Sequence, residues 1–233
     1  MTESVSGLID WKEIASKSGT LIMITGKSSS GKDTVTGKLR ESPHFAHLNL
    51  TQIVTTASRK PRPNEVHGRE YYFSDLDVMK EMEKRGEFIE ILTQTGASYD
   101  IKATETKEIL PVIYSGETRI WRADLSRSAD VAKGGYFYKY LKKEEADILE
   151  SRTIVVLIES DPNLDTETIM NIRKERDKEK FDRATYEIRD KEEQRILKKH
   201  GHHFKHRVVN KWNQLDSTVS EVSDLLLNFI NSR

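Results

Sequence analysis

Residues 21–34 read LIMITGKSSSGKDT and decide the fold of this 233-residue chain. Four apolar residues come first, and the run ends at Gly26 in a loop of glycine, serine and lysine. Val35 and Leu39 follow at helical spacing. An apolar run that passes through a glycine-rich loop into a helical pattern predicts a buried strand, a tight turn and a helix.

The loop matches the pattern G-x-x-x-x-G-K of the P-loop, in which backbone N–H groups turn inward on phosphate oxygens and a lysine neutralises their charge. Lys32 is that lysine, and ATP with Mg²⁺ is the expected cofactor. The usual Ser/Thr ligand of Mg²⁺ is replaced by Asp33, and either Asp33 or Thr34 would hold the metal, with Thr34 favoured. The candidate cofactor-binding residues are Gly26, Ser28, Ser29, Ser30, Gly31, Lys32, Asp33 and Thr34.

Apolar and β-branched runs alternate with helical patterns along the rest of the chain. This alternation predicts an α/β fold in which a mainly parallel sheet is flanked by helices. A helix is expected from Asp75 to Met82, and a C-terminal helix from Thr218, with Thr218 and Glu221 as a capping box. The strands are expected at residues 21–24, 48–56, 120–125, 153–158 and 208–209.

Composition excludes several classes of protein. Lys and Arg together number 38, as do Asp and Glu, so no net charge attracts the chain to nucleic acid or to an anionic membrane. Cysteine is absent, which removes disulfides and thiolate catalysis. Neither a signal peptide nor a membrane-spanning run is visible, so we expect a cytoplasmic protein. The oligomeric state is left open.

Residues 55–73, TTASRKPRPNEVHGREYYF, form a second informative segment. Arg59 and Arg62 lie three residues apart on a loop that two prolines stiffen, and guanidinium groups suit a phosphate monoester dianion. Tyr71 and Tyr99 add hydroxyl donors.

Together with the P-loop and RGEFIE at residues 85–90, this segment resembles the guanylate kinases, and the resemblance covers about residues 21–230. It implies transfer of the terminal phosphoryl group of ATP to GMP, giving GDP and ADP. It also implies a single domain, 1–233, with a core of about 19–50, 108–164 and 191–233, an acceptor-binding part of about 51–107 and a lid of about 165–190. The residues implied at the acceptor are Thr55, Arg59, Arg62, Tyr71, Glu90 on the guanine edge, and Tyr99.

Three features depart from the family pattern. The tyrosine at position 99 is followed by Asp100 and Ile101, where a glycine and a small hydroxyl residue are usual. A D-x-D pair near Ile120 is replaced by Arg122 and Asp124, which would share a strand face and either line the acceptor site or form an ion pair. Asp124 is kept as a substrate-binding candidate. Residues 132–150 are additional, as a partner surface or a longer helix.

The charged stretch 165–190 carries the arginines that the resemblance assigns to the lid. Closing guanidinium groups over a transferring phosphoryl group stabilises its negative charge. Arg173, Arg176 and Arg183 are the catalytic candidates beside Lys32, with Arg183 preferred, and Arg189 lies in the same stretch.

Two other functions stay open. One is a kinase of a different phosphorylated acceptor, such as another nucleotide or a ribosyl bisphosphate, because Gly-Lys-Asp also occurs in that class of P-loop. The other is an interaction domain of the same fold without catalysis. The run HGHHFKH, 200–206, is interpreted as an exposed polar turn in preference to a zinc site, because no cysteine or neighbouring acidic ligand accompanies it.

Overall fold

The computed structural model describes residues 9–90, 93–94, 101–178 and 181–233. A five-stranded, fully parallel sheet in the order β2-β7-β1-β8-β9 forms its centre. The predicted α/β fold with a parallel sheet is therefore confirmed. The strands are β1 (Leu21–Thr25), β2 (Thr51–Gln52), β7 (Arg119–Trp121), β8 (Thr153–Ser160) and β9 (His206–Asn210).

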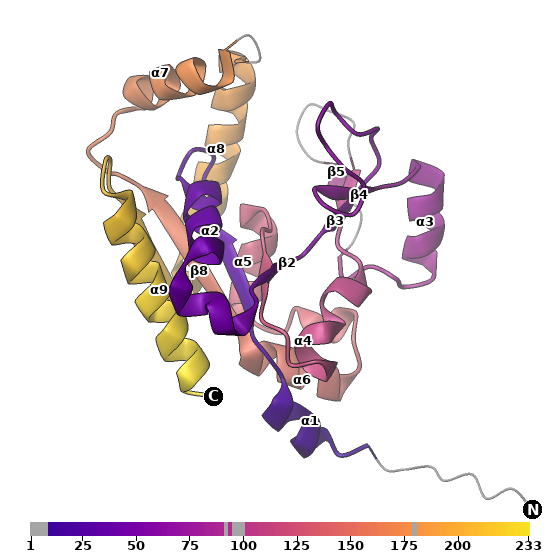
Figure 1. Ribbon diagram of the computed structural model, residues 1–233. Coiled ribbons are helices and arrows are strands. Elements are labelled where there is room, and N and C mark those ends of the chain that lie inside the picture. Colours follow the sequence, from indigo (N-terminus) through magenta and orange to yellow (C-terminus); the bar gives the residue numbers. More distant parts are fainter. Residues whose placement is uncertain (1–8, 91–92, 95–100, 179–180) are drawn as a thin grey trace, which may run out of the picture.

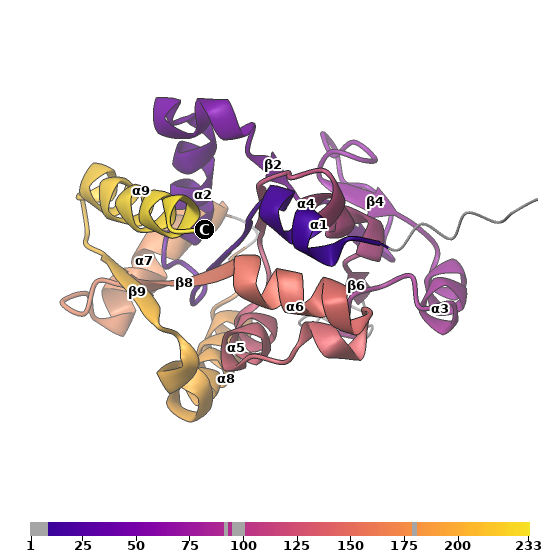
Figure 2. The same ribbon diagram turned by 90° about the horizontal axis from the view of Figure 1, so that it is seen from below.

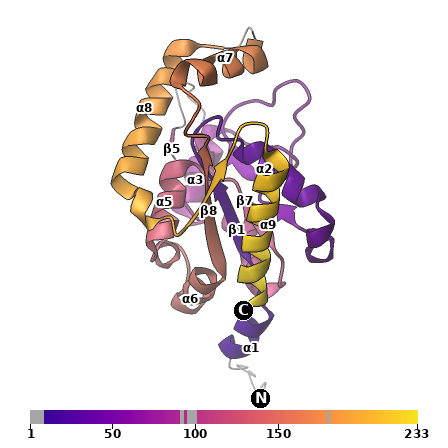
Figure 3. The same ribbon diagram turned by 90° about the vertical axis from the view of Figure 1, so that its left-hand side faces the viewer.

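Helices cover both faces of this sheet (Figure 3). Because side chains alternate along a strand, Ile22 and Ile24 of β1 join the core under α2 (Lys32–Glu41) and α9 (Leu215–Asn231). Leu21 and Met23 point the other way, into the core shared with α5 (Leu125–Lys133) and α6 (Lys143–Arg152). Every residue of β1 is buried, as its continuous apolar run predicts.

A second, four-stranded mixed sheet stands beside the first, with α3 (Leu76–Lys84) next to it (Figure 1). The carboxylate of Glu108 ties the two sheets together. It accepts hydrogen bonds from the Val54 N–H at 3.2 Å, the Tyr72 hydroxyl at 2.9 Å and Arg119 Nη1 at 3.1 Å. The strands, in the order β4-β3-β6-β5, are β3 (Thr55–Ala57), β4 (Tyr71–Phe73), β5 (Thr93–Gln94) and β6 (Ile101–Ala103).

The stretch predicted as the lid forms α7 (Thr166–Asp177) and the first part of α8 (Arg183–His200), which extends alongside the sheet (Figure 3). At the other end, α1 (Trp11–Lys17) and α4 (Leu110–Tyr114) pack together (Figure 2). The remaining short helices are η1 (Pro43–Leu48), η2 (Thr106–Glu108), η3 (Phe137–Lys139) and η5 (Gly201–His203). In the part of the chain that the structure describes, no helix is long and apolar enough to cross a membrane.

Three predicted element boundaries are wrong, and local backbone geometry explains each. The strand expected at 48–56 begins later, because Leu48 ends η1 and Asn49 has a φ of 45° that is incompatible with a strand, and the remainder divides into β2 and β3 of different sheets. The strand expected to reach Leu125 ends at Trp121, because Asp124 caps α5 through the Arg127 N–H.

The C-terminal helix begins at Leu215, so Thr218 is an interior residue and the capping box with Glu221 does not form. The Thr218 hydroxyl bonds instead to Asn210 Oδ1 at 3.1 Å and to the Gln214 carbonyl.

Residues 132–150 contribute apolar side chains to the core, and their interpretation as a partner surface stays a prediction for exposed side chains of the segment such as Tyr138. Tyr136 and Phe137 are 2% and 0% exposed, and Leu149 of α6 is fully buried. Their apolar side chains pack in the same cluster as Leu21 and Met23 of β1. The segment therefore thickens one layer of the fold.

Candidate active site

The loop between β1 and α2 has the geometry of a phosphate cradle. Gly31 precedes α2 with a φ of 85°, a left-handed conformation that favours glycine. A Cβ at this position would lie 2.1 Å from Asn210 Nδ2, which donates to the Ser30 carbonyl at 2.9 Å. The predicted order of strand, glycine loop and helix is confirmed, and the N–H groups that begin α2 face the loop.

Buried polar atoms without partners surround this cradle. Among the described residues, the hydroxyl oxygens of Thr25 and Ser30 and Nη1 of Arg173 are buried and make no hydrogen bond. Burial also lowers the pKa of Lys32, although the charges of Asp33 and Glu193 act in the opposite direction. Because buried donors and an ammonium group need an anionic partner, these residues fit the phosphates of a nucleotide.

A carboxylate already contacts the loop. Glu193, on α8, accepts hydrogen bonds from the Ser28 N–H and the Ser28 hydroxyl, both at 2.8 Å. One turn earlier, Asp190 forms an ion pair of 2.6 Å with Lys27. Sequence reasoning missed both acids, because they are far from the loop along the chain and resemble the other charges of α8. The Glu193 contact shows that the Ser28 N–H of the loop binds an oxyanion.

The predicted lid arginines occupy different places. Arg173 is 1% exposed and bridges α7 to the loop, since its Nε donates to Ser29 Oγ at 2.6 Å and its Nη2 donates to the Ser28 carbonyl. Its guanidinium also stacks 4.3 Å from the ring of Tyr186. Arg176 contacts the hydroxyl of Tyr186 at 3.3 Å. The structure therefore brings Arg173 to the phosphate loop.

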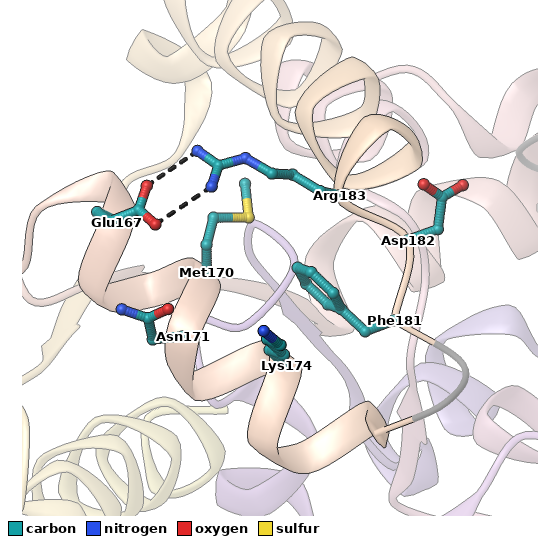
Figure 4. A pocket seen from close by; sticks show the side chains of 7 residues that line it. All are labelled: Glu167, Met170, Asn171, Lys174, Phe181, Asp182 and Arg183. Carbon is teal, nitrogen blue, oxygen red and sulfur yellow. Dashed lines mark hydrogen bonds and ion pairs between the residues drawn. The ribbon is translucent and has the colours of Figure 1, made fainter.

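Arg183 points elsewhere. Its guanidinium crosses to α7 and pairs with Glu167 at 2.9 Å and with Glu187 at 2.8 Å, beside a pocket between the two helices (Figure 4). Arg189 lies closer to the loop, because its Nε is 3.9 Å from Glu193 and its charge lowers the pKa of Lys32. Spacing alone did not separate these two arginines, since both are exposed positions of one helix. The pocket is lined by Glu167, Met170, Asn171, Lys174, Phe181, Asp182 and Arg183.

The second sheet holds the candidate acceptor-phosphate residues. Arg59 forms a two-point ion pair with Glu65, at 2.5 and 2.6 Å, and lies over the rings of Tyr71 and Phe73. Hydrogen bonding by Arg59 lowers the pKa of Glu65 to about 2. Lys102, which sequence reasoning missed, donates to the Tyr71 hydroxyl at 3.0 Å.

The other candidate acceptor-binding residues are less closely grouped than Arg59 and Tyr71. Arg62 is exposed, and its backbone N–H donates to Glu65 at 2.8 Å. Thr55 is half-buried at the start of β3. Tyr99 and Asp100 lie outside the described residues, and Ile101 begins β6.

Glu90, expected on the guanine edge, lies beside a cation that sequence reasoning missed, since Arg127 Nε is 2.7 Å from Glu90 Oε2. Asp124, the other substrate-binding candidate here, accepts a hydrogen bond from the backbone N–H of Arg127 at 3.0 Å and so caps α5. A charged residue one turn before buried Val131, on the apolar side of α5, is the sequence signal that could have identified it.

Arg122 and Asp124 do not pair, contrary to one expectation, because the strand has already ended. Arg122 forms an ion pair of 3.3 Å with Asp33 instead. Asp33 and Thr34 are both exposed in the first turn of α2.

The histidine run ends α8 and forms η5. His202 is exposed, its ring lies 3.9 Å from that of His203, and Phe204 is buried beneath them. Within the described ranges, no three His, Asp or Glu side chains gather as a metal cluster.

A parallel sheet with a glycine loop between β1 and α2, faced by charged helices, defines a P-loop nucleotide-binding protein. The chain belongs to the guanylate kinase family, whose profile matches residues 18–228.

Three guanylate kinases illustrate the likeness. That of Trichormus variabilis is 32% identical over 114 residues, 49% of this chain and 54% of the relative. That of Aromatoleum aromaticum is 47% identical over 73 residues, 31% and 33% of the two chains. That of Lactococcus lactis is 36% identical over 92 residues, 40% and 43% of the two chains. These matches span about half or less of the curated relatives' length.

The crystal structure of guanylate kinase from Anaplasma phagocytophilum has a similar fold. It superposes with a TM-score of 0.58 at 15% identity, covering 92% of this chain and 87% of that one.

Proposed function

We propose that this protein transfers the terminal phosphoryl group of ATP to GMP, forming ADP and GDP. The observation that carries the proposal is the phosphate cradle, in which Lys32, Arg173 Nη1 and buried hydroxyl groups are suited to bind an anion. Family membership and the names of the relatives support the same reaction.

At the donor side, the loop from Gly26 to Thr34 holds the phosphates of ATP. Lys32 places its ammonium group against the transferring phosphoryl, and Asp33 or Thr34 holds Mg²⁺ directly or through water. When bound, the metal would neutralise negative charge on the phosphates. Asp33 would have to release Arg122, 3.3 Å away, to take the metal, so Thr34 is the favoured ligand.

At the acceptor side, Arg59 exchanges the carboxylate of Glu65 for the phosphate of GMP. The exchange keeps a two-point contact and the stacking on Tyr71, so little order is lost. Arg62, Tyr71 and Tyr99 complete the phosphate contacts. Thr55, Glu90 and Asp124 lie at the base.

The lid comprises about residues 165–190, and it closes the reaction from water. Arg173 turns its Nη1 toward the transferred phosphoryl group, and Arg176 on α7 and Arg183 on α8 approach it as the lid closes. Arg183 must first release Glu167. The core and the acceptor-binding part, about 51–107, provide the two surfaces that the lid joins.

One observation favours the alternative of a different phosphorylated acceptor. Asp100 and Ile101 stand where a glycine and a small hydroxyl residue are usual in the family. A coupled ADP-release assay with GMP, AMP, CMP, UMP and ribose 1,5-bisphosphate separates the candidates. Release of ADP with GMP alone supports the proposal. Release with another acceptor alone would make that compound the substrate in place of GMP. Absence of release with all of them would leave the non-catalytic interaction domain.

Removing the competing carboxylate should tighten ATP binding. We expect Glu193→Gln to lower the dissociation constant of ATP about tenfold, because a neutral amide repels the triphosphate less and holds Ser28 less strongly. Titration calorimetry with ATP and Mg²⁺ measures the change. Glu192→Gln, an exposed neighbour that pairs with Arg195, is the matched control and should bind as the wild type does. Weaker binding by Glu193→Gln would instead make Glu193 part of the nucleotide site.

Loss of the Arg59 guanidinium, which we propose binds the acceptor phosphate, should raise the KM of one substrate only. We expect Arg59→Ala to raise the KM for GMP about 30-fold, with a smaller fall in kcat, because two charge-assisted hydrogen bonds to phosphate are lost. The KM for ATP should stay within about twofold. Arg69→Ala, an exposed arginine of the same loop that pairs with Glu70, serves as the control in initial-rate assays. Equal damage to both substrates would contradict the assignment.

A further inference from the structure

Arg127 is a buried charge at an unfavourable place. It is the third residue of α5, only 9% exposed, and the positive end of a helix dipole repels a cation there. Burial of an unpaired guanidinium would cost several kcal/mol. Its partners must therefore compensate, and they indicate what it does.

A chain of contacts fixes the guanidinium. Arg127 Nη1 donates to the Tyr136 hydroxyl at 3.0 Å, and that hydroxyl donates to the Ile89 carbonyl at 2.9 Å. The guanidinium also lies 5.8 Å from the centre of the Tyr136 ring. On its other side, Nε lies 2.7 Å from Glu90 Oε2 and forms an ion pair with it, although the N–H is not directed at that oxygen. Thus Tyr136, from the additional segment 132–150, anchors the cation that orients Glu90.

The charge of Arg127 opposes the effect of burial on Glu90. Burial raises the pKa of the Glu90 carboxyl, the Arg127 charge and a hydrogen bond from Thr104 lower it, and the charge of Asp124 raises it. Three further titratable groups lie at this cluster: Tyr136, Tyr140 with its ring 5.3 Å from that of Tyr136, and Lys139 with its ammonium group 5.6 Å from the Tyr136 ring. Removing the guanidinium would leave a buried carboxyl beside Asp124, and it would take up a proton at higher pH than now.

Protonation of the Glu90 carboxyl would weaken recognition of the guanine base. An ionised carboxylate accepts two hydrogen bonds, which match the N1–H and exocyclic amine of guanine, whereas a protonated carboxyl directs a donor at them. We propose that Arg127, anchored by Tyr136, is a positioning residue that presents Glu90 to the acceptor base as an oriented, ionised acceptor. This inference rests on the proposed function, because it takes guanine as the group that Glu90 meets.

Two variants separate the charge of Arg127 from its bulk. We expect Arg127→Met to lower kcat/KM for GMP about 100-fold at pH 7, through KM, while the KM for ATP stays within about twofold. The loss should shrink as pH rises toward 9, because the Glu90 carboxyl ionises above its pKa. Arg127→Lys, which keeps the charge, should lose less than about fivefold at any pH in this range. Lys133→Met, in the last turn of the same helix, is the control for loss of a charge on α5.

A second readout needs no turnover. In protein labelled with ¹³C at glutamate carboxyl groups, the Glu90 resonance is identified by its absence in Glu90→Gln, and its pH titration is followed by NMR. We expect a higher midpoint in Arg127→Met than in the wild type, and a midpoint in Arg127→Lys close to that of the wild type. Tyr136→Phe should raise the KM for GMP about fivefold without a pH slope, because the charge remains and only its anchor is lost.

The outcomes are distinct. A pH profile of Arg127→Met parallel to that of the wild type, or an unchanged Glu90 midpoint, would overturn the positioning role. If Arg127→Met does not fold, Arg127→Lys and Tyr136→Phe decide, and a KM for GMP unchanged in Tyr136→Phe overturns the proposal. A wild type that phosphorylates no nucleotide while its Glu90 midpoint still depends on Arg127 would reject the proposed function alone and leave the control of Glu90 by Arg127 standing.

Discussion

Lys32→Met is expected to lower kcat by a factor on the order of 10³ and to leave the fold intact. The ammonium group is the positive charge nearest to the transferred phosphoryl in the proposed complex, and loss of one such preorganised group costs about 4 kcal/mol of transition-state stabilisation. The methionine side chain has a similar length, and the burial that lowers the pKa of Lys32 favours an apolar replacement.

The measurement is the rate of ADP release at saturating ATP and GMP, with the thermal unfolding midpoint of each protein recorded beside it. Lys38→Met is the matched control, because Lys38 is an exposed residue of the same helix. Within the described residues, its one ion pair is with Glu41, at 3.9 Å. Near wild-type turnover of Lys32→Met with GMP would show that the glycine loop does not serve the reaction.

Glu90→Gln is expected to reduce the preference for GMP over AMP, expressed as a ratio of kcat/KM, by a factor on the order of 10². Guanine presents N1–H and an exocyclic amine that a carboxylate accepts together, whereas adenine presents an acceptor at N1. The wild type should therefore prefer GMP by roughly 10⁴. The ratio should fall because kcat/KM for GMP falls, since a neutral amide replaces a charge-assisted acceptor.

The same substitution removes the partner of a buried guanidinium, so stability must be measured with activity. We expect the free energy of unfolding to fall by about 3 kcal/mol, because Arg127 would stay buried without its counter-charge. Glu87→Gln, three residues earlier and paired with exposed Arg85, controls for loss of an acid in this segment. A wild type that uses AMP or CMP as well as GMP would reject the guanine assignment and leave the kinase assignment intact.

The phosphate loop could be predicted from the sequence because its chemistry is local. Gly31 must adopt a positive φ, Lys32 must follow it, and a buried strand must precede it, all within residues 21–34. The parallel sheet followed in the same way from apolar runs separated by helical patterns. Hydrophobic periodicity did not give the boundaries, since it registers neither the φ of Asn49, which delays β2, nor the capping of α5 by Asp124 after the end of β7.

The partners of the site residues were decided by the tertiary structure. Nothing within α8 distinguishes Glu193 from its acidic neighbours, yet the packing of that helix places its carboxylate on the Ser28 N–H, 165 residues away along the chain. Likewise Glu90 acquires Arg127 from α5 and, through it, Tyr136 from the additional segment.

The sequence by itself thus determined where the glycine loop lies and indicated the candidate phosphate-binding segments, because the turn of the loop is built from consecutive residues. Only the tertiary structure decided which charges face those segments, because ion pairs form between side chains that the fold brings within a few ångströms. Their strength then depends on how completely the surrounding core excludes water.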